Sequence, residues 1–315
     1  MILVAGTLVA DLIVKPVRSW PSERNNQNVD SIEIFPGGAV ANTGLALARL
    51  GIPVSAYGSV GEDHLGSIVR SVLSQWATRQ TVTSVPSNRT TCSIVAVSET
   101  GERCFLAAAG ACDQFQLTLE QVEKEISDGV RALHIGYAML LPRLDGEPLR
   151  QVMRRARELG ALTSLDVCYF DHFPWPDLMR LMPEIDVFCP NLPEACAITG
   201  QRNAADAAAA LVGAGVRKFV AITEGERGVL VHVVGESQEY IPARPVKVVD
   251  TTGAGDAFVA GVLAAWYRGL PWRSAGHIGT LVASLAITST TRYGNLPNFN
   301  ELTNYAEADL FSCRQ

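Results

Sequence analysis

The chain has 315 residues, of which 48% are hydrophobic and 18% charged, and its formal net charge is −6. The low charged fraction is typical of a large buried core, and the acidic balance without a Lys/Arg run argues against a nucleic-acid partner. No apolar segment reaches the roughly 20 residues of a membrane span, and the N-terminus lacks a signal-peptide pattern. The seven cysteines show neither a CxxC pair nor zinc spacing. We therefore expect a cytoplasmic protein with reduced thiols and no membrane partner.

Short β-branched runs alternate with longer helical patterns along most of the chain. The candidate core strands are 2–5, 54–60, 132–135, 162–166, 187–190, 219–223 and 229–234. The candidate helices are 39–50, 65–75, 118–127, 149–159, 204–214 and 256–268. Such alternation is typical of βαβ units joined by right-handed crossovers. The pattern predicts an α/β fold in which helices flank a mainly parallel sheet in a Rossmann-like three-layer core.

Two regions interrupt this alternation. Residues 11–35 form an extended excursion, and residues 90–109 are typical of a hairpin with a turn at 99–102. Strands that do not alternate with helices cannot easily join a parallel sheet, so we expect them to form a small β lid over the strand ends. No linker or repeat divides the chain, which predicts a single domain over residues 1–315. Exposed lid strands also favour a homodimer that pairs two lids.

A glycine-rich turn leads directly into a helix within residues 249–258, VDTTGAGDAF. Gly253, Ala254 and Gly255 allow backbone N–H groups to converge, and the positive end of the helix dipole points to the same place. Such a place binds an anion, most usefully a phosphate in transfer. The carboxylate of Asp256 could take a proton from a hydroxyl that attacks this phosphate. The motif favours phosphoryl transfer to an alcohol, and a tight turn with a helix-capping Asp is the structural alternative.

A second motif lies near the N-terminus in residues 35–44, FPGGAVANTG. Gly37 and Gly38 lack a Cβ, so backbone amides there can approach a polyhydroxylated ligand closely. Asn42 follows one helical turn later and can both donate to and accept from sugar hydroxyls. The structural alternative is a strand-to-helix turn with a polar cap.

Together these two motifs resemble those of the ribokinase (pfkB) family of carbohydrate kinases, and the resemblance extends over essentially the whole chain. It implies a ribokinase-like fold and an enzyme that uses ATP and Mg²⁺. The implied reaction is transfer of the γ-phosphate to a hydroxyl of a small sugar, most naturally a primary one. In this pattern Asp256 is the catalytic base, and Gly253, Ala254 and Gly255 form the anion hole for the phosphate.

The resemblance also assigns an acceptor site. Gly37, Gly38 and Asn42 correspond to sugar-binding positions, and Asp11 resembles the carboxylate that clamps two sugar hydroxyls. Arg103, on the second lid strand, is a further candidate because it could meet a carboxylate or phosphate of the substrate. An arginine on a hairpin is otherwise a solvated edge residue.

The nucleotide site is implied by two short segments. Asn191 to Glu194 resembles the NxxE element, in which Glu194 acts on Mg²⁺ through water and Asn191 contacts nucleotide phosphates. A helix cap is the alternative interpretation of Asn191. The turn at 223–228 resembles the one beneath the nucleotide, where Thr223 reaches a phosphate or ribose and Gly225 makes room for the base. An ordinary hairpin turn is the alternative there.

Asp250 and Thr252 match positions that hold a monovalent cation in many relatives. The loop at 292–297 is shorter than the cation loop of those relatives and lacks their extra Ser, which argues against activation by K⁺.

Three other functions stay open at this point. A kinase of the same fold acting on a nucleoside or a vitamin alcohol is the nearest. An NAD-dependent oxidoreductase is more remote, because Phe258 stands where GxGxxG needs its third glycine and no strand-end acid follows about 20 residues on. A sugar-binding regulator without catalysis would be expected to lack Asp256. The sequence does not identify the sugar or the oligomeric state.

Overall fold

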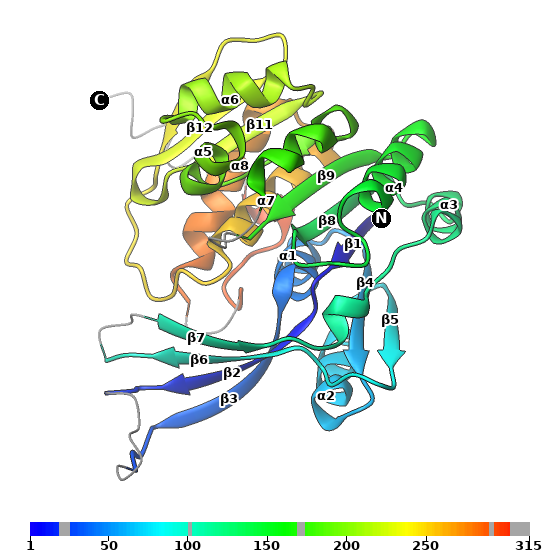
Figure 1. The fold of residues 1–315 in the computed structure, drawn as a ribbon. Helices are drawn as coiled ribbons and strands as arrows, with labels where there is room; N and C mark the ends of the chain where they lie inside the picture. The colour runs from blue at the N-terminus through cyan, green and yellow to red at the C-terminus, as the bar shows by residue number, and fades with distance from the viewer. Residues whose placement is uncertain (19–25, 100–102, 169–173, 290–292, 303–315) are drawn as a thin grey trace.

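The computed structural model describes residues 1–18, 26–99, 103–168, 174–289 and 293–302, and these residues form two sheets with flanking helices (Figure 1). The larger sheet has the strand order β13-β12-β11-β10-β9-β8-β1-β4-β5. Its strands are β1 (Ile2–Gly6), β4 (Val54–Gly61), β5 (Arg79–Val85), β8 (Ala132–Ala138), β9 (Leu162–Val167), β10 (Val187–Phe188), β11 (Phe219–Thr223), β12 (Gly228–Val233) and β13 (Glu239–Pro242). The strands from β11 to β5 pair in parallel, whereas β12 and β13 pair antiparallel at one edge.

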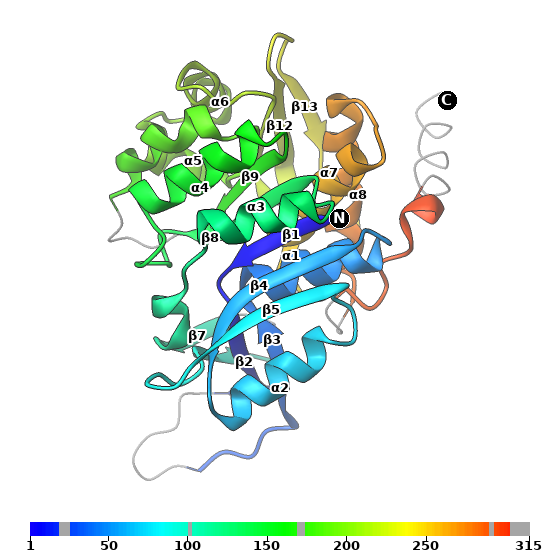
Figure 2. The ribbon, with the colours of Figure 1, turned by 90° about the vertical axis from the view of Figure 1, so that its right-hand side faces the viewer.

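Helices cover both faces of this sheet (Figures 1 and 2). The described α-helices are α1 (Gly38–Arg49), α2 (His64–Leu73), α3 (Leu119–Ser127), α4 (Glu147–Glu158), α5 (Leu192–Thr199), α6 (Ala204–Gly213), α7 (Ala254–Tyr267) and α8 (Trp272–Ala286). Side chains of β1 alternate between the two faces, as the pleat of a strand requires. Leu3 and Ala5 pack in the core under α3 to α6, whereas Ile2 and Val4 pack in the core under α1, α7 and α8.

The predicted α/β architecture is confirmed. Each predicted helix is present within a few residues of its expected bounds. The strand predicted at 229–234 is β12 (Gly228–Val233), although this strand runs antiparallel to β11. The sequence analysis missed β5, β13 and α5, which are short or polar elements, and its candidate helices do not include α8. No helix in the described part of the chain is long and apolar enough to cross a membrane.

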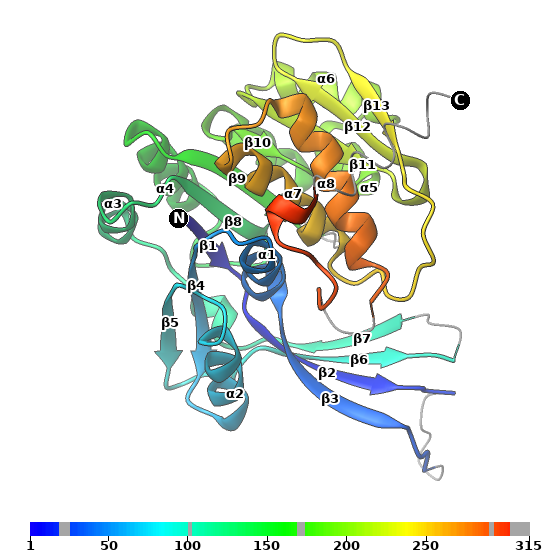
Figure 3. The same ribbon diagram turned by 180° about the vertical axis from the view of Figure 1, so that it is seen from behind.

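The two interrupting regions form one four-stranded sheet that projects from the end of the core (Figures 1 and 3). Its order is β3-β2-β6-β7, with β2 (Val9–Lys15), β3 (Ser31–Gly37), β6 (Cys92–Val97) and β7 (Arg103–Ala108). We call this sheet the lid. The interrupting region at residues 11–35 joins the one at residues 90–109, because β2 pairs in parallel with β6. Of the predicted hairpin turn, residues 100–102 lie outside the described residues.

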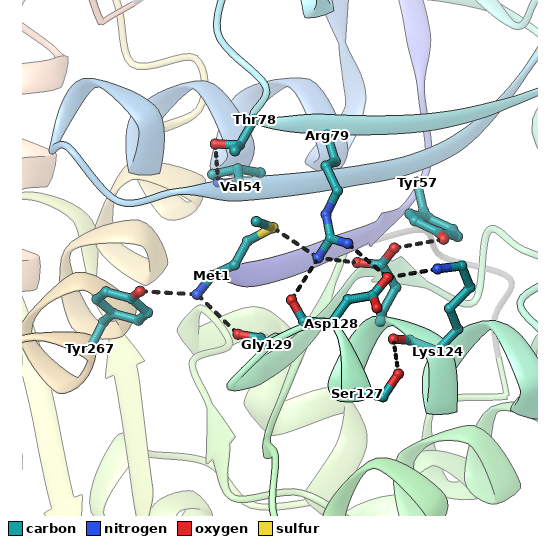
Figure 4. A network of polar contacts seen from close by, with 11 residues as sticks. Met1, Val54, Tyr57, Thr78, Arg79, Lys124, Ser127, Asp128, Gly129 and Tyr267 are labelled. Atoms are coloured by element: carbon teal, nitrogen blue, oxygen red, sulfur yellow. Dashed lines mark hydrogen bonds and ion pairs between the residues drawn. The ribbon is translucent and has the colours of Figure 1, made fainter.

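A polar network at the opposite end of β1 ties the edge of the large sheet to its neighbours (Figure 4). Arg79, at the start of β5, donates to Asp128 Oδ2 across 3.1 Å, and Lys124 of α3 donates to the same oxygen across 2.7 Å. The ammonium group of Met1 donates to the hydroxyl of Tyr267, the last residue of α7, across 3.0 Å. The contact of Met1 lies at the amino end of β1. The chain leaves the carboxyl end of β1 to enter the lid at β2.

Candidate active site

The turn before α7 depends on a glycine. Gly253 is the N-cap of the helix with φ of 73°, a left-handed conformation that side chains rarely adopt. A Cβ at this position would lie 2.1 Å from the hydroxyl of Tyr293. That hydroxyl donates to the Gly253 carbonyl oxygen across 2.9 Å, which holds the turn in place. The predicted glycine turn into a helix is therefore present, and the helix begins two residues before Asp256.

Asp256 accepts hydrogen bonds from three side chains. Its Oδ1 accepts from the hydroxyl of Thr43 across 2.9 Å. Its Oδ2 accepts from Asn42 Nδ2 across 3.2 Å and from the hydroxyl of Tyr137 across 2.8 Å. The side chain lies on the first turn of α7 but is only 3% exposed. The sequence analysis expects this carboxyl group to face an acceptor alcohol, whereas the structure covers it with protein donors.

The candidate acceptor residues meet where the lid joins the core. Asp11 lies on β2, and a Cβ on Gly37 would come within 2.1 Å of its Oδ2, so the carboxylate lies against the bare glycine. Gly38 opens α1 with φ of 77° and packs against Thr7, which follows β1. One turn later on the same helix, Asn42 reaches Asp256. The structure thus brings the sugar-binding candidates of the first motif next to the base candidate of the second.

Tyr137 is a functional candidate that the sequence analysis missed. It has φ of 58°, which is uncommon for a residue with a Cβ, and it lies where the β8–β9 pairing is irregular between Ile135 and Ala138. Burial, and then the charge of Asp256, raise the pKa of the Tyr137 hydroxyl well above its usual range. The group therefore remains a protonated donor. No pattern in the sequence distinguishes this tyrosine from a core aromatic residue.

Carboxylates gather beside Asp256. Asp166, near the end of β9, is 8% exposed, and burial followed by the charges of Asp256 and Glu194 raises its pKa well above the usual range. Burial, and then Asp166, also raise the pKa of Cys168 to about 12. Such a cluster of buried acids favours a positive charge nearby.

The chemistry of these carboxylates fits Mg²⁺ better than a transition metal. Hard oxygen donors suit Mg²⁺, which keeps several waters when it binds together with nucleotide phosphates. Within the described ranges, no group of three or more His, Cys, Asp or Glu side chains is arranged to hold a metal directly. A bound Mg²⁺ would lie beside Asp166 and Glu194 and would keep waters in its coordination shell.

Asn191 and Glu194 form a capping box at the start of α5. The Glu194 N–H donates to Asn191 Oδ1 across 2.9 Å, and the Asn191 N–H donates to Glu194 Oε2 across 2.8 Å. The helix-cap interpretation of Asn191 is thus correct. The charge of Glu194 also acts on Asp166 and Cys168, so this helix start borders the acid cluster.

A cavity of about 760 Å³ lies on the other side of the α7 N-terminus. Thr223, at the end of β11, and Gly225 line it together with Ala254 and Gly255 of the glycine-rich turn. A Cβ on Gly225 would meet no atom within 4 Å, so the missing side chain leaves open space there. The apolar part of the wall consists of Val246, Val248, Phe258, Ala283 and Ile287. The cavity has the size and polarity of a small-ligand site that ends at a helix N-terminus.

Arg103 and Asp250 form an ion pair that joins the lid to the segment before α7. Asp250 Oδ1 also accepts from the Thr252 N–H across 2.7 Å. Burial favours the protonated acid, but the hydrogen bonds from Arg103 and Thr252 outweigh it and lower the pKa of Asp250. Arg103 is thus not a solvated edge residue, because its guanidinium pairs with Asp250. Of the loop at 292–297, Arg292 lies outside the described residues.

Known proteins resemble this chain over most of its length. The family model for pfkB carbohydrate kinases matches residues 1–298. A fructokinase of Vibrio alginolyticus is 28% identical over 289 residues, covering 86% of this chain and 91% of that protein. A ribokinase of Haemophilus influenzae is 27% identical over 316 residues, covering 96% of this chain and 97% of that protein.

Solved structures show the same fold. Arabidopsis thaliana ribokinase complexed with ribose and ATP superimposes with a TM-score of 0.81 at 23% identity, covering 96% of this chain and 97% of that one. The family model and the fructokinase and ribokinase relatives define a phosphotransferase whose acceptor is an alcohol group. The chain belongs to the pfkB family of carbohydrate kinases, which confirms the resemblance found in the sequence.

Proposed function

We propose that the protein transfers the γ-phosphate of ATP to a hydroxyl, most naturally a primary one, of a small carbohydrate, with Asp256 as the general base. The observation that carries this proposal is the hydrogen bond between Asn42 and Asp256. It joins the motif suited to sugar hydroxyls to the motif suited to a phosphate in transfer. Sugar and phosphate therefore have a common meeting point at the N-terminus of α7.

The acceptor would bind between the lid and the core. Asp11, Gly37 and Gly38 lie at this junction, and a carboxylate beside bare backbone suits the paired hydroxyls of a sugar. Asp256 would take the proton of the reacting hydroxyl as its oxygen attacks the γ-phosphorus. The bond between that phosphorus and the β-phosphate oxygen breaks, and ADP leaves.

The nucleotide would occupy the 760 Å³ cavity. Its apolar wall suits a base, and the open space at Gly225 leaves room for it. The phosphates would extend to Gly253, Ala254 and Gly255, where backbone N–H groups and the helix dipole stabilise negative charge. Bound Mg²⁺ would neutralise phosphate charge beside the carboxylates of Asp166 and Glu194.

A nucleoside is the second candidate acceptor. A cytidine kinase of Thermococcus kodakarensis is 42% identical over 106 residues, which cover 33% of this chain and 37% of that protein. Phe105 of β7 is 57% exposed and shares a lid face with Arg103, which contacts the core. An exposed aromatic ring facing the acceptor side could stack on a base.

The test is ADP release from Mg-ATP with a panel of pentoses, hexoses, sugar phosphates, sugar acids and nucleosides. We expect a free sugar to give the highest kcat/KM. Preference for a nucleoside would select the second candidate, and no acceptor-dependent release with any compound would contradict both.

We also propose that two copies pair through their lids. The face of the lid that points away from Arg103 and the core carries exposed apolar side chains on three strands: Ile32, Ile34, Ile94 and Leu106. Burying such a face in a second copy would remove this apolar surface from water.

A further inference from the structure

In the arrangement described here, Oδ2 of Asp256 cannot receive an alcohol. A carboxylate oxygen has two in-plane lone pairs, and Oδ2 of Asp256 already accepts from both Asn42 and Tyr137. Asp256 is 3% exposed, so protein atoms cover the carboxylate. Either Asn42 or Tyr137 must leave Oδ2 before an acceptor can donate its proton to that oxygen.

Tyr137 is the donor that can leave most easily. Asn42 lies inside α1, 5% exposed, and its helix packs against α7, which carries Asp256. Tyr137 instead lies at the irregular end of β8 with a left-handed backbone, a conformation that is costly for a residue with a Cβ. Its phenol is longer than the Asn42 amide and bears a single hydroxyl donor, as an acceptor alcohol does.

We propose that the Tyr137 hydroxyl occupies, in the substrate-free protein, the position on Asp256 Oδ2 that the acceptor alcohol takes during catalysis. This inference rests on the proposed function. The acceptor displaces the phenol and donates to Oδ2 in its place. Until then the tyrosine keeps the base from activating water, so bound ATP is not hydrolysed.

The reaction that Tyr137 suppresses is ordinary hydrolysis. Water attacks the γ-phosphorus, its proton passes to Asp256, and the bond to the β-phosphate oxygen breaks to give ADP and phosphate. Asp256 then returns the proton to solvent. The phenol does not replace water in this role, because its hydroxyl stays protonated beside Asp256.

The experiment compares ATP hydrolysis without acceptor in four proteins: wild type, Tyr137→Phe, Asp256→Asn and the double variant. We expect Tyr137→Phe to raise acceptor-free ADP release by about 10-fold, a part of the roughly 10²–10⁴-fold that a general base supplies. The rise must vanish in the double variant, because it needs the carboxylate. An unchanged rate in Tyr137→Phe, or a rise that persists with Asp256→Asn, overturns the proposal.

The same variant gives a second readout with acceptor present. Since the acceptor no longer has to displace a phenol, its KM should fall while kcat stays near the wild-type value. A lower kcat with unchanged KM would mean that Tyr137 holds Asp256 in position during the reaction, and this result also overturns the proposal. Tyr137→Asn, whose side chain tolerates the left-handed backbone, is a second variant with the same expectations.

Tyr57→Phe is the matched control. Tyr57 is a tyrosine of the core, 5% exposed, and its hydroxyl donates to Glu125 Oε1 across 3.0 Å, away from Asp256. We expect it to leave both rates unchanged. If no acceptor supports ADP release in wild type, the proposed function fails, whereas the acceptor-free rates of the four proteins still decide the role of Tyr137.

Discussion

Asn42 Nδ2 donates a hydrogen bond to Asp256 Oδ2 across 3.2 Å, although the two residues lie 214 positions apart in the sequence. This contact joins α1 to α7 at the point where the lid meets the core. Acceptor recognition and proton transfer therefore share one hydrogen-bonded unit, and substitutions on either side should act on the same step.

The close approach of Gly37 to Asp11 can be tested with one methyl group. Gly37→Ala places a Cβ 2.1 Å from the present position of Asp11 Oδ2, at a backbone φ of −127° that any residue adopts. The methyl group should displace the carboxylate and raise the acceptor KM on the order of 10-fold, equivalent to about 1.4 kcal/mol. Gly213→Ala is the control, because a Cβ there meets nothing within 4 Å. Equal KM values for the two variants would show that Asp11 does not bind the acceptor.

The ion pair between Arg103 and Asp250 should make the enzyme insensitive to K⁺. The guanidinium already neutralises Asp250, so replacing KCl by tetramethylammonium chloride should change kcat little. Arg103→Met should lower kcat/KM by about 10-fold, because it leaves a partly buried carboxylate without its cation. Arg18→Met, which removes an exposed pair with Glu99, should have no effect. Strong K⁺ activation of the wild type would contradict this account.

The apolar outer face of the lid should control the oligomeric state. Ile32 is 63% exposed on that face, and a lysine in its place would have to be desolvated in a lid-to-lid dimer. Light scattering should give twice 33.8 kDa for wild type and 33.8 kDa for Ile32→Lys. Leu159→Lys, at the end of α4, should leave the mass of the wild type unchanged. A wild type that is monomeric at micromolar concentration rules out this interface.

His134 should make the protein less stable in weak acid. It is fully buried on β8, and burial lowers its pKa from 6.5 to about 3. Because the folded pKa is depressed, stability is complete above pH 6.5 and is lost as the pH falls toward 3. From pH 7.5 to 5.5 the loss should be about 1.4 kcal/mol from this group. Urea unfolding of His134→Asn should show a weaker pH dependence over this interval, and parallel curves would contradict the prediction.

Much of the fold and of the candidate site was predictable, because the signals are local. Alternating apolar runs predicted the parallel sheet, and the glycines before Asp256 predicted the turn into α7. The lid followed from strands that no helix accompanied. Polar edge strands such as β5 were missed because they carry few apolar residues and these do not alternate with polar ones, as the mostly exposed side chains of the strand reflect.

The contacts of Asp256 could not be predicted in the same way. Tyr137 reaches the carboxylate through an irregularity in the pairing of β8, and no sequence pattern signals its register. The partner of Arg103 was also not predictable, since the ion pair depends on how the lid docks on the segment before α7. Both contacts depend on tertiary placement, which local sequence patterns do not encode.

The kinetics of Asp256→Asn test the central claim most directly. The amide keeps the shape of the side chain but cannot take a proton, so ATP should bind as before while kcat with the best acceptor falls by roughly 10²–10⁴-fold. Binding of ATP is measured by titration calorimetry, and kcat by acceptor-dependent ADP release. Turnover of Asp256→Asn at the wild-type rate would contradict the account.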